Sequence, residues 1–372
     1  NALNSAEPII SPSWSPDGKS VAYWSDASGE YQLMLYDVTG KEEPKTLTNF
    51  TNGFNYSIYW SPDSKKIVYV DQAMNINYMD ISTGKIIKAD KGKSMFEGAL
   101  RNFKVTWSPD SKWFAYARGT DNPATTAIFL YDGQNNKLSQ LTSGYYSDSS
   151  PAFSADGKYL FFTTNRTFQP VYSDLDNTFI YPNTTNIAVG ALNSSVSSLL
   201  SVKNDDLETP KKEEVENKKD SKSKNKKGAD KDKDSKKEAV KTTIEINGFE
   251  NRVEMLEIDP GNLGSLTAIE NKLLFIRSPN AGSPKGSSPS LDYYDLKERE
   301  VKTIIPKVSD YQVAANGKKV LVLQEQKLAV IDIKADQKIE KAVPTQNMIM
   351  NVVPKEEWKQ IFNDVWRFER DY

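Results

Sequence analysis

The sequence has no cysteine and no histidine among its 372 residues. The lack of cysteine excludes disulfides, thiolate metal sites and cysteine nucleophiles. The lack of histidine removes the usual general base of serine hydrolases and the commonest transition-metal ligand. Carboxylate-only or serine–lysine chemistry stays open in principle, although nothing in the sequence argues for it. We therefore predict no catalytic residues, no cofactor-binding residues and no metal ligands in this chain.

Long apolar runs and an excess of positive charge are also absent. No apolar stretch approaches the roughly 20 residues that span a bilayer, so we expect no membrane span. The 48 basic and 50 acidic residues give a net charge of −2, which provides no field to attract nucleic acid. The sequence begins with no signal-peptide pattern, but a removed signal or missing upstream sequence would look the same. Composition therefore leaves the compartment undecided.

What the sequence does contain is a repeat. Trp-Ser-Pro-Asp-Gly-Lys at residues 14–19 returns as Trp-Ser-Pro-Asp-Ser-Lys at 60–65 and 107–112, and as Phe-Ser-Ala-Asp-Gly-Lys at 153–158. The leading aromatic residues are thus 46, 47 and 46 positions apart. In each copy proline presets φ, the aspartate bonds back to the backbone and glycine accepts positive φ, which together make a tight turn.

Weaker copies begin at Leu266 and Val313, and short β-branched and aromatic runs follow every turn. Four short strands per repeat, with a period in the forties, are typical of a propeller blade. We predict an all-β fold: a β-propeller of four-stranded blades over residues 1–345, with blades starting near residues 11, 57, 104, 150, 263 and 310. Six blades can close a ring alone; equally, a seventh can lie upstream of Asn1.

The fourth visible blade carries an insertion, because Phe153 and Leu266 are 113 residues apart. One part is a long polar and aromatic loop at residues 165–186. The other is a charged low-complexity segment at 191–243, in which residues 203–241 include 14 lysines and 11 acids. Such a segment cannot bury apolar surface, so a solvated surface loop is expected. The alternative is a docking arm or a metal trap, suggested by Asp230, Asp232 and Asp234.

After Pro344 the pattern becomes helical. Pro354 and the two glutamates that follow it suit a helix N-terminus. Apolar residues then recur at three- and four-residue spacings, at Trp358, Ile361, Phe362, Val365 and Phe368. We predict an amphipathic helix at residues 354–372 that opens a further, helical domain. The alternative is a helix that folds back on the propeller.

The acids of the repeat are the nearest approach to a candidate site. Those within the turns are expected to be structural: Asp17, Asp63, Asp110 and Asp156. Those at strand ends could line one face of the ring, although turn and edge roles explain them as well: Asp37, Asp80, Asp132, Asp295 and Asp332. Pro-Lys-Gly-Ser-Ser at residues 284–288 lacks the spacing of a phosphate loop and favours a linker turn.

The repeats alone resemble the propellers of TolB-type proteins and dipeptidyl peptidases, but three further segments are more specific. Ile-Asn-Gly-Phe-Glu-Asn-Arg-Val at residues 246–253, followed by Pro-Gly-Asn at 260–262, resembles the stretch after a Lys/Glu-rich insertion in bacterial tricorn protease homologues. The other two segments resemble the long blade loop of that family and the first helix of its catalytic region: residues 165–172 with 179–183, and residues 356–367 with 370–372.

The resemblance implies a serine peptidase with two propellers, a helical core domain, a PDZ domain and an α/β core domain. The family's catalytic serine, histidine and acid lie in the core domains, and no position of this sequence matches them. The implied function is to gate or guide unfolded peptides toward a catalytic core that this chain does not contain. This chain alone is then expected to be inactive. The propeller before the helical domain has seven blades in that family, which favours a missing first blade here.

The partners implied by the resemblance are peptide substrates and the protein's own downstream core and PDZ domains, and a homo-oligomer stays open. Bacterial relatives with such insertions favour a periplasmic or other extracytoplasmic setting, with the cytoplasm as the alternative. A stand-alone TolB-type propeller that acts as a protein-binding scaffold is the second functional hypothesis. A sugar- or nucleotide-processing propeller enzyme is the third, and the lack of histidine weakens it.

Overall fold

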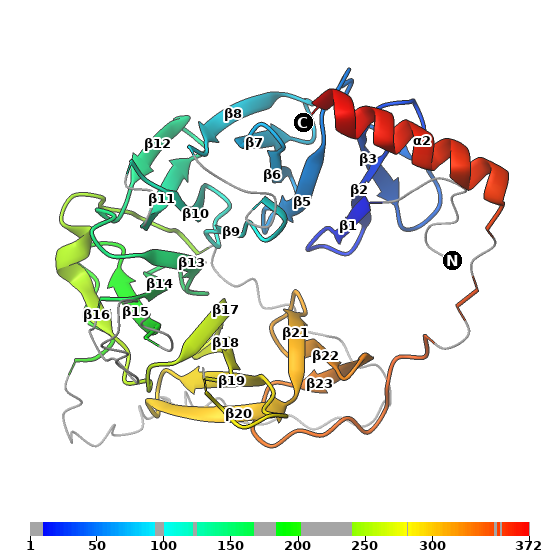
Figure 1. Cartoon of the computed structure of the whole chain (residues 1–372). Helices are drawn as coiled ribbons and strands as arrows, with labels where there is room; N and C mark the ends of the chain where they lie inside the picture. Colours follow the sequence, from blue (N-terminus) through cyan, green and yellow to red (C-terminus); the bar gives the residue numbers. More distant parts are fainter. Residues whose placement is uncertain are drawn as a thin grey trace, which may run out of the picture.

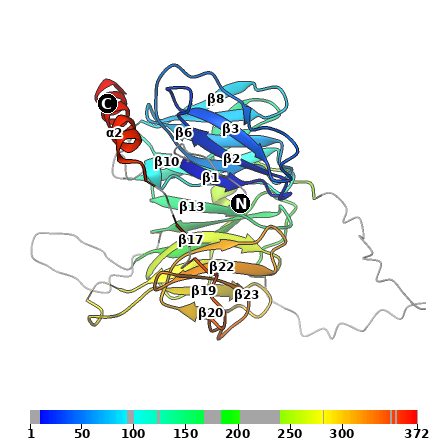
Figure 2. The ribbon, with the colours of Figure 1, turned by 90° about the vertical axis from the view of Figure 1, so that its right-hand side faces the viewer.

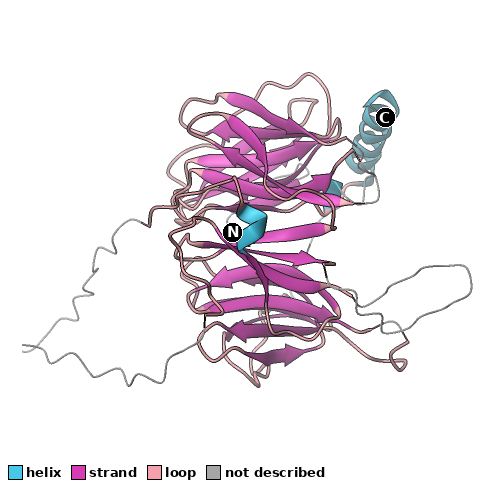
Figure 3. Cartoon of the chain, turned by 90° about the vertical axis from the view of Figure 1, so that its left-hand side faces the viewer, coloured by secondary structure: helices cyan, strands magenta, loops and turns pink. Residues whose placement is uncertain are grey.

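The structure is a computed structural model that describes residues 10–93, 100–121, 125–166, 184–201, 240–280, 282–345, 348–349 and 352–371. Within these ranges the chain forms six antiparallel sheets in succession, one for each sequence repeat. Figure 1 shows the sheets arranged around a common axis, and Figure 3 shows that strands make up almost all of the regular structure. The predicted all-β propeller is therefore confirmed.

The strands of the first three blades are short and follow each turn directly. They are β1 (Ile10–Trp14), β2 (Ser20–Ser25), β3 (Gln32–Asp37) and β4 (Lys45–Thr46); β5 (Asn55–Trp60), β6 (Lys66–Asp71), β7 (Asn75–Asp80) and β8 (Ile86–Lys91); and β9 (Val105–Trp107), β10 (Trp113–Gly119), β11 (Thr126–Asp132) and β12 (Lys137–Gln140).

The last three blades follow the same order, but the sixth has three strands among the described residues. They are β13 (Asp148–Phe153), β14 (Tyr159–Thr164), β15 (Asn186–Ala191) and β16 (Val253–Met255); β17 (Asn262–Ile269), β18 (Lys272–Ser278), β19 (Ser290–Asp295) and β20 (Glu300–Pro306); and β21 (Val308–Val313), β22 (Lys319–Gln324) and β23 (Lys327–Asp332). The short 3-10 helix η1 (Phe249–Arg252) precedes β16, and the predicted C-terminal helix is α2 (Pro354–Asp371).

The antiparallel order gives the propeller two different faces. We call the side on which the first strand of each blade turns into the second the turn face, because it carries the repeated Ser-Pro-Asp-Gly turns. The opposite side, where the second strand of each blade ends, is the loop face. Figure 2 shows α2 standing on one side of the stacked strands, and its contacts with residues just after β2 identify that side as the loop face.

The turns have the expected backbone geometry. Gly18 and Gly157 have φ of 71° and 67°, and the serines at the same turn position, Ser64 and Ser111, adopt φ of 59°. Each serine offsets this unfavourable conformation with a contact that glycine cannot make: the hydroxyl oxygen of Ser64 accepts a hydrogen bond from the backbone N–H of Asp17 at 3.1 Å. Ser111 does the same for the next turn at 3.0 Å. Neighbouring turns are therefore linked across blades.

Apolar side chains fill the spaces between neighbouring blades. Five clusters of buried residues join each of the six blades to the next, from the first pair to the fifth and sixth. Fully buried examples are Trp24, Phe114, Phe161 and Phe275. Among the described residues no comparable cluster joins the sixth blade to the first, and Figure 1 shows the arc of sheets open on that side.

The tryptophans that lead the second and third repeats tie their blades to the preceding one. The indole N–H of Trp60 donates to the backbone oxygen of Ser13 at 3.1 Å, and that of Trp107 donates to Tyr59 at 3.3 Å. Trp14, which leads the first repeat, is 55% exposed, whereas Trp107 is 8% exposed. The difference follows from position, because no blade of the described chain lies on that side of Trp14.

The ends of the charged insertion pack against the propeller. The insertion leaves the sheet after β15 and returns before β16, and Leu192 and Phe249 lie in the core between the third and fourth blades. The backbone N–H of Thr242 donates to the carboxylate of Asp110 at 3.1 Å, so the returning segment is fixed to a turn of the third blade. Asp230, Asp232 and Asp234 lie outside the described residues.

Candidate functional site

Among the described residues, the loop face carries four arginine–aspartate ion pairs that join separate segments of the chain, each formed at or near the end of a second strand. The pairs, with their closest N–O distances, are Arg118–Asp90 at 2.6 Å, Arg166–Asp148 at 2.8 Å, Arg277–Asp292 at 3.4 Å and Arg367–Asp26 at 2.5 Å. The aspartate of every pair is less than a tenth exposed. Charges this deeply buried are costly unless they are paired, so each pair fixes the geometry around it.

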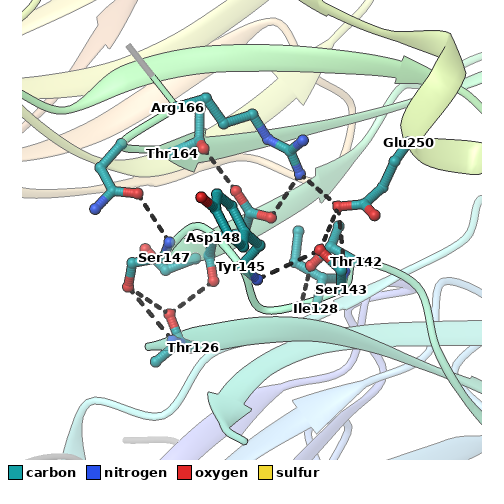
Figure 4. Close-up of polar contacts among 12 residues, drawn as sticks. Thr126, Ile128, Thr142, Ser143, Tyr145, Ser147, Asp148, Thr164, Arg166 and Glu250 are labelled. Carbon is teal, nitrogen blue, oxygen red and sulfur yellow. Dashed lines mark hydrogen bonds and ion pairs between the residues drawn. The ribbon is translucent and has the colours of Figure 1, made fainter. Parts of the chain in front are cut away.

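The pair formed by Arg166 lies at the base of the long loop in the fourth blade (Figure 4). Asp148, the first residue of β13, is fully buried and accepts a second hydrogen bond from the Thr164 hydroxyl at 2.6 Å. The Arg166 guanidinium also donates to Glu250 in η1 at 3.0 Å. Glu250 in turn accepts from the backbone N–H and hydroxyl of Ser143, both at 3.1 Å. The cluster thus joins the third and fourth blades.

The electrostatics of this cluster keep Arg166 charged. Burial lowers the pKa of Arg166, but the hydrogen bonds and charges of Asp148 and Glu250 outweigh burial and raise the pKa above its ordinary value. The guanidinium also lies over the rings of Tyr146 and Phe162, at 5.1 and 5.7 Å from their centres. These contacts fix the position of the Arg166 side chain on the propeller. Arg166 is the last described residue before residue 184.

The second feature of the loop face is the junction with α2. Arg367 is 7% exposed; its guanidinium donates to the carboxylate of Asp26 at 2.5 Å and to the backbone oxygen of Gly29 at 3.0 Å. Burial lowers the pKa of Arg367, but the bond and charge of Asp26 outweigh it, and the pKa is raised. One turn away, Arg370 forms a bidentate pair with Glu30 at 2.7 and 3.0 Å.

The polar side of α2 makes the contacts, and its apolar side faces solvent. Gln360 and Asp371 add hydrogen bonds to Asp26 and to the backbone N–H of Gly53, at 2.5 and 3.1 Å. The apolar residues on the rest of the helix are all more than half exposed: Trp358, Ile361, Phe362, Val365, Trp366 and Phe368. This is the reverse of an ordinary surface helix, which buries its apolar stripe. The helix does rest on the propeller, but mainly through its polar side; of the predicted stripe, Phe368 also lies at the junction.

A pocket of about 230 Å³ lies inside this junction. Tyr31 and Phe54 line it from the propeller, and Arg367, Phe368 and Asp371 line it from the helix. The guanidinium of Arg367 lies over the Tyr31 ring, 4.8 Å from its centre. Burial, followed by the charges of Asp364 and Asp26, raises the pKa of Tyr31. The phenol therefore stays neutral and serves the packing of the helix.

The acids that the sequence singled out lie on the turn face. Asp17, Asp63, Asp110 and Asp156 each accept a hydrogen bond from the serine two residues earlier, at 2.5 to 2.7 Å. The strand-end acids cap the next turn: Asp37, Asp80, Asp132 and Asp295 accept backbone N–H groups, and Asp332 pairs with Lys319 and Lys334. These bonds match the structural interpretation of both sets.

Other candidate chemistry finds little support in the described chain. Ser287 donates its backbone N–H to Pro284 at 3.1 Å, so residues 284–288 contain a turn. In the described ranges, no group of three acidic residues is arranged to hold a metal ion. Nor does any helix of those ranges have the length and hydropathy that a membrane span needs.

Comparison with known proteins decides the family. The family described as the tricorn protease second beta propeller domain matches residues 11–334. The chain belongs to this family. Tricorn protease homolog 1 of Streptomyces coelicolor is 23% identical over 379 residues, covering 96% of this chain and 33% of the relative. The tricorn protease of Thermoplasma volcanium is 23% identical over 366 residues, covering 95% and 31%.

A crystal structure of the tricorn protease has the same fold as this chain, with a TM-score of 0.73 at 20% identity, covering 98% of this chain and 33% of that one. The chain spans about a third of the length of the curated relatives it matches. The resemblance inferred from residues 246–253 and 356–367 is thereby confirmed at the level of the family.

Within this tricorn-type propeller, sequence reasoning missed all four arginine–aspartate pairs. Their partners are 28, 18, 15 and 341 residues apart, so no short motif joins them. One signal was available: arginine is rare among the first 300 residues, and Arg118, Arg166 and Arg277 stand at equivalent places after the apolar run of a second strand. An isolated arginine at such a repeated position favours a buried carboxylate partner.

Proposed function

We propose that this chain is the propeller part of a tricorn-like serine peptidase, and that it gates or guides unfolded peptides toward a catalytic core outside the chain. The observation that carries the proposal is α2, which docks by its polar side and leaves its apolar side uncovered. Family membership supplies the context, since the relatives are tricorn proteases about three times as long.

The exposed stripe of α2 argues for a second domain. Six large apolar side chains on one helix, all more than half exposed, form a surface that costs free energy in water. Other helices of a core domain would cover it, while Arg367 and Arg370 hold the same helix against the propeller. In this arrangement α2 fixes the orientation of the core relative to the ring. A stand-alone scaffold of the TolB type has no need of such a helix.

A complete ring would act as a steric filter. An extended strand is far narrower than a folded domain, which is tens of ångströms across. A peptide that is already unfolded would therefore pass along the axis, and a folded protein would be held back. The first strands of the blades lie nearest the axis in Figure 1 and would line this path.

We propose further that a seventh blade closes the ring between the sixth blade and the first. The support is that no core cluster of the described residues joins the sixth blade to the first, together with the exposure of Trp14, whose equivalents Trp60 and Trp107 donate to the preceding blade. A blade placed there would accept the Trp14 indole N–H and cover its ring. It would also protect the free edge that an open arc leaves.

The first test uses this chain and the full-length protein side by side. We expect the full-length protein to degrade unfolded casein in a manner that serine-directed inhibitors block, and to leave a folded protein intact. We expect this chain alone to cleave neither. Inhibitor-sensitive cleavage by this chain would contradict the proposal, and so would a coding sequence that stops directly after Tyr372.

The second test blocks the ring. Because the chain has no cysteine, Ser265→Cys on β17 provides a single attachment point for a bulky maleimide in the full-length protein. We expect the label to slow casein degradation and to spare cleavage of a short chromogenic substrate. Ser283→Cys, on the outer loop of the same blade, is the matched control. Equal casein rates in the two labelled proteins would exclude passage through the ring.

A further inference from the structure

A groove of about 560 Å³ lies at the loop-face end of the fifth blade, away from α2 and from the Arg166 cluster. Glu257 and Asp259 line it from the connection between β16 and β17. The other lining residues come from the outer three strands of the fifth blade: Arg277, Ser290, Asp292, Val301 and Thr303. The groove therefore lies between a connecting segment and the face of a rigid sheet.

The lining of the groove is negative. It contains three carboxylates and one guanidinium, together with the hydroxyl groups of Ser290 and Thr303. Charges of one sign that line a concave surface reinforce one another and favour a ligand of opposite charge. The groove is therefore suited to a cation.

Arg277 is held in place and neutralises only part of this charge. Its Nη1 donates to the backbone oxygen of Asp259 at 3.2 Å, and its Nε lies 3.4 Å from Oδ2 of Asp292. A Cβ atom at Gly261 would come within 3.0 Å of the same Nη1, so the glycine leaves the room that the guanidinium occupies. The arginine is thus directed at one oxygen of Asp292, and the other oxygen is left over.

That remaining oxygen is the decisive feature. Asp292 is 3% exposed, and its Oδ1 is buried without a hydrogen-bond partner among the described residues. A buried carboxylate oxygen nearly always has a donor, because leaving it unpaired is costly. A donor brought by a ligand would complete the coordination of Asp292.

We propose that this groove binds an organic cation, an alkylammonium or guanidinium group, with Asp292 as the buried acceptor and Glu257 and Asp259 at the rim. A single metal ion does not suit these acids, since no three of the described acidic residues are grouped closely enough to hold one. An extended cation with several N–H donors can reach acceptors that are further apart. This inference goes beyond the proposed function and does not depend on it.

The test is a calorimetric titration of this 372-residue chain with three probes: Nα-acetyl-arginine amide, its neutral citrulline analogue and spermidine. We expect saturable binding of the arginine probe and binding of the citrulline probe that is at least about tenfold weaker. Tighter binding of spermidine than of the arginine probe would identify a free polyamine as the source of the cation. The opposite order would identify a basic side chain. Both orders support the site.

Variants locate the binding. We expect Asp292→Asn to weaken the arginine probe about tenfold or more and Glu257→Gln to weaken it severalfold. Glu300→Gln removes the same charge from β20 outside the groove and should change nothing. If Asp292→Asn does not fold, Glu257→Gln and the citrulline comparison still show whether the arginine probe binds in this groove through its positive charge.

The proposal is overturned by any of three binding results. These are no saturable binding of the arginine probe, equal binding of the citrulline probe, or affinities that Glu257→Gln and a folded Asp292→Asn leave unchanged. A high-resolution crystal structure soaked with the arginine probe that shows only an ordered water on Oδ1 of Asp292 would also overturn it.

Discussion

The two faces of this propeller are built by different means. On the turn face, the aspartate within each of the four strong turns is bound by a serine two residues earlier, and the same six-residue pattern makes the same turn four times. On the loop face, stability comes from arginine–aspartate pairs whose partners lie 15 to 341 residues apart. The turn face is therefore local and repeated, and the loop face is nonlocal and different in each blade.

Two ion pairs of the turn face differ in burial from the arginine–aspartate pairs of the loop face as well. Lys19–Asp17 and Lys158–Asp156 on the turn face are 3.9 and 4.0 Å apart, and all four side chains are more than 40% exposed. Water and salt screen such pairs, which contribute little to stability. The buried pairs on the loop face are screened far less, so removing one partner there leaves a buried charge. We therefore expect the removal of an ion-pair partner to lower the free energy of unfolding more on the loop face than on the turn face.

The largest expected effect is on the Arg166 cluster. We expect Arg166→Ala to lower the free energy of unfolding by about 3 kcal/mol or more, because the fully buried Asp148 loses its counter-charge. Lys158→Ala on the turn face of the same blade should stay within about 0.5 kcal/mol. Urea denaturation followed by tryptophan fluorescence measures both.

A double-substituted protein sharpens this comparison. Since Arg166→Ala/Asp148→Asn has no charge left to bury, it should recover part of the loss. If Arg166→Ala and Lys158→Ala cost the same, the distinction between the two faces is wrong.

The junction with α2 should give the next largest effect, confined to the helix. We expect Arg367→Ala to release α2, because the buried Asp26 then loses its ion pair and Gly29 its donor. Hydrogen exchange of residues 354–371 should become at least about tenfold faster, while exchange of the blades stays as before. Lys359→Ala, on the same helix, is the control. Unchanged protection of α2 in Arg367→Ala would show that the ion pair does not hold it.

A smaller effect is expected from two glycines of the turn face. Both Gly18 and Gly157 have positive φ, so alanine at either costs about 1 kcal/mol. A Cβ at Gly157 would also clash with the hydroxyl oxygen of the buried Thr242, whereas nothing lies within 4 Å at Gly18. Gly157→Ala should therefore destabilise more than Gly18→Ala in thermal denaturation. Equal melting temperatures would mean that the insertion does not pack on this turn.

The smallest expected effect concerns pH and a turn-face acid. Burial raises the pKa of Asp63, but hydrogen bonds from Ser61 and the Lys65 N–H and the charge of Lys66 outweigh it, so the pKa lies below the ordinary 3.8. A lowered folded-state pKa stabilises the protein above the unfolded value, and this contribution is lost as the pH falls through the folded value.

We expect Asp63→Asn to remove that part of the acid sensitivity, which sets in below about pH 5 and continues as the pH falls through the lowered folded-state pKa, by less than about 1 kcal/mol because the group is partly exposed. Unfolding curves of both proteins at each pH measure it. Identical pH dependence in the two proteins would count against the turn bonds of Asp63.

Much of the fold was predictable because its signals are local. The period of 46 or 47 residues, the turn chemistry and the short apolar runs predicted the blades, and the apolar stripe after Pro354 predicted α2. The direction of that stripe was not predictable. A helical stripe says that one side is apolar, but not whether a neighbour lies against that side or against the other.

The sequence by itself determined the repeated blades and the turn face, because each turn is closed by residues two to five positions apart that any copy of the motif brings together. Only the tertiary structure decided the loop face. Asp148 meets Arg166, Asp292 meets Arg277 and Asp26 meets Arg367 because the strands and α2 carry them there. A charge pair formed between separate strands, or between a blade and α2, depends on where two segments end in space, and a single sequence does not encode that distance in any local pattern.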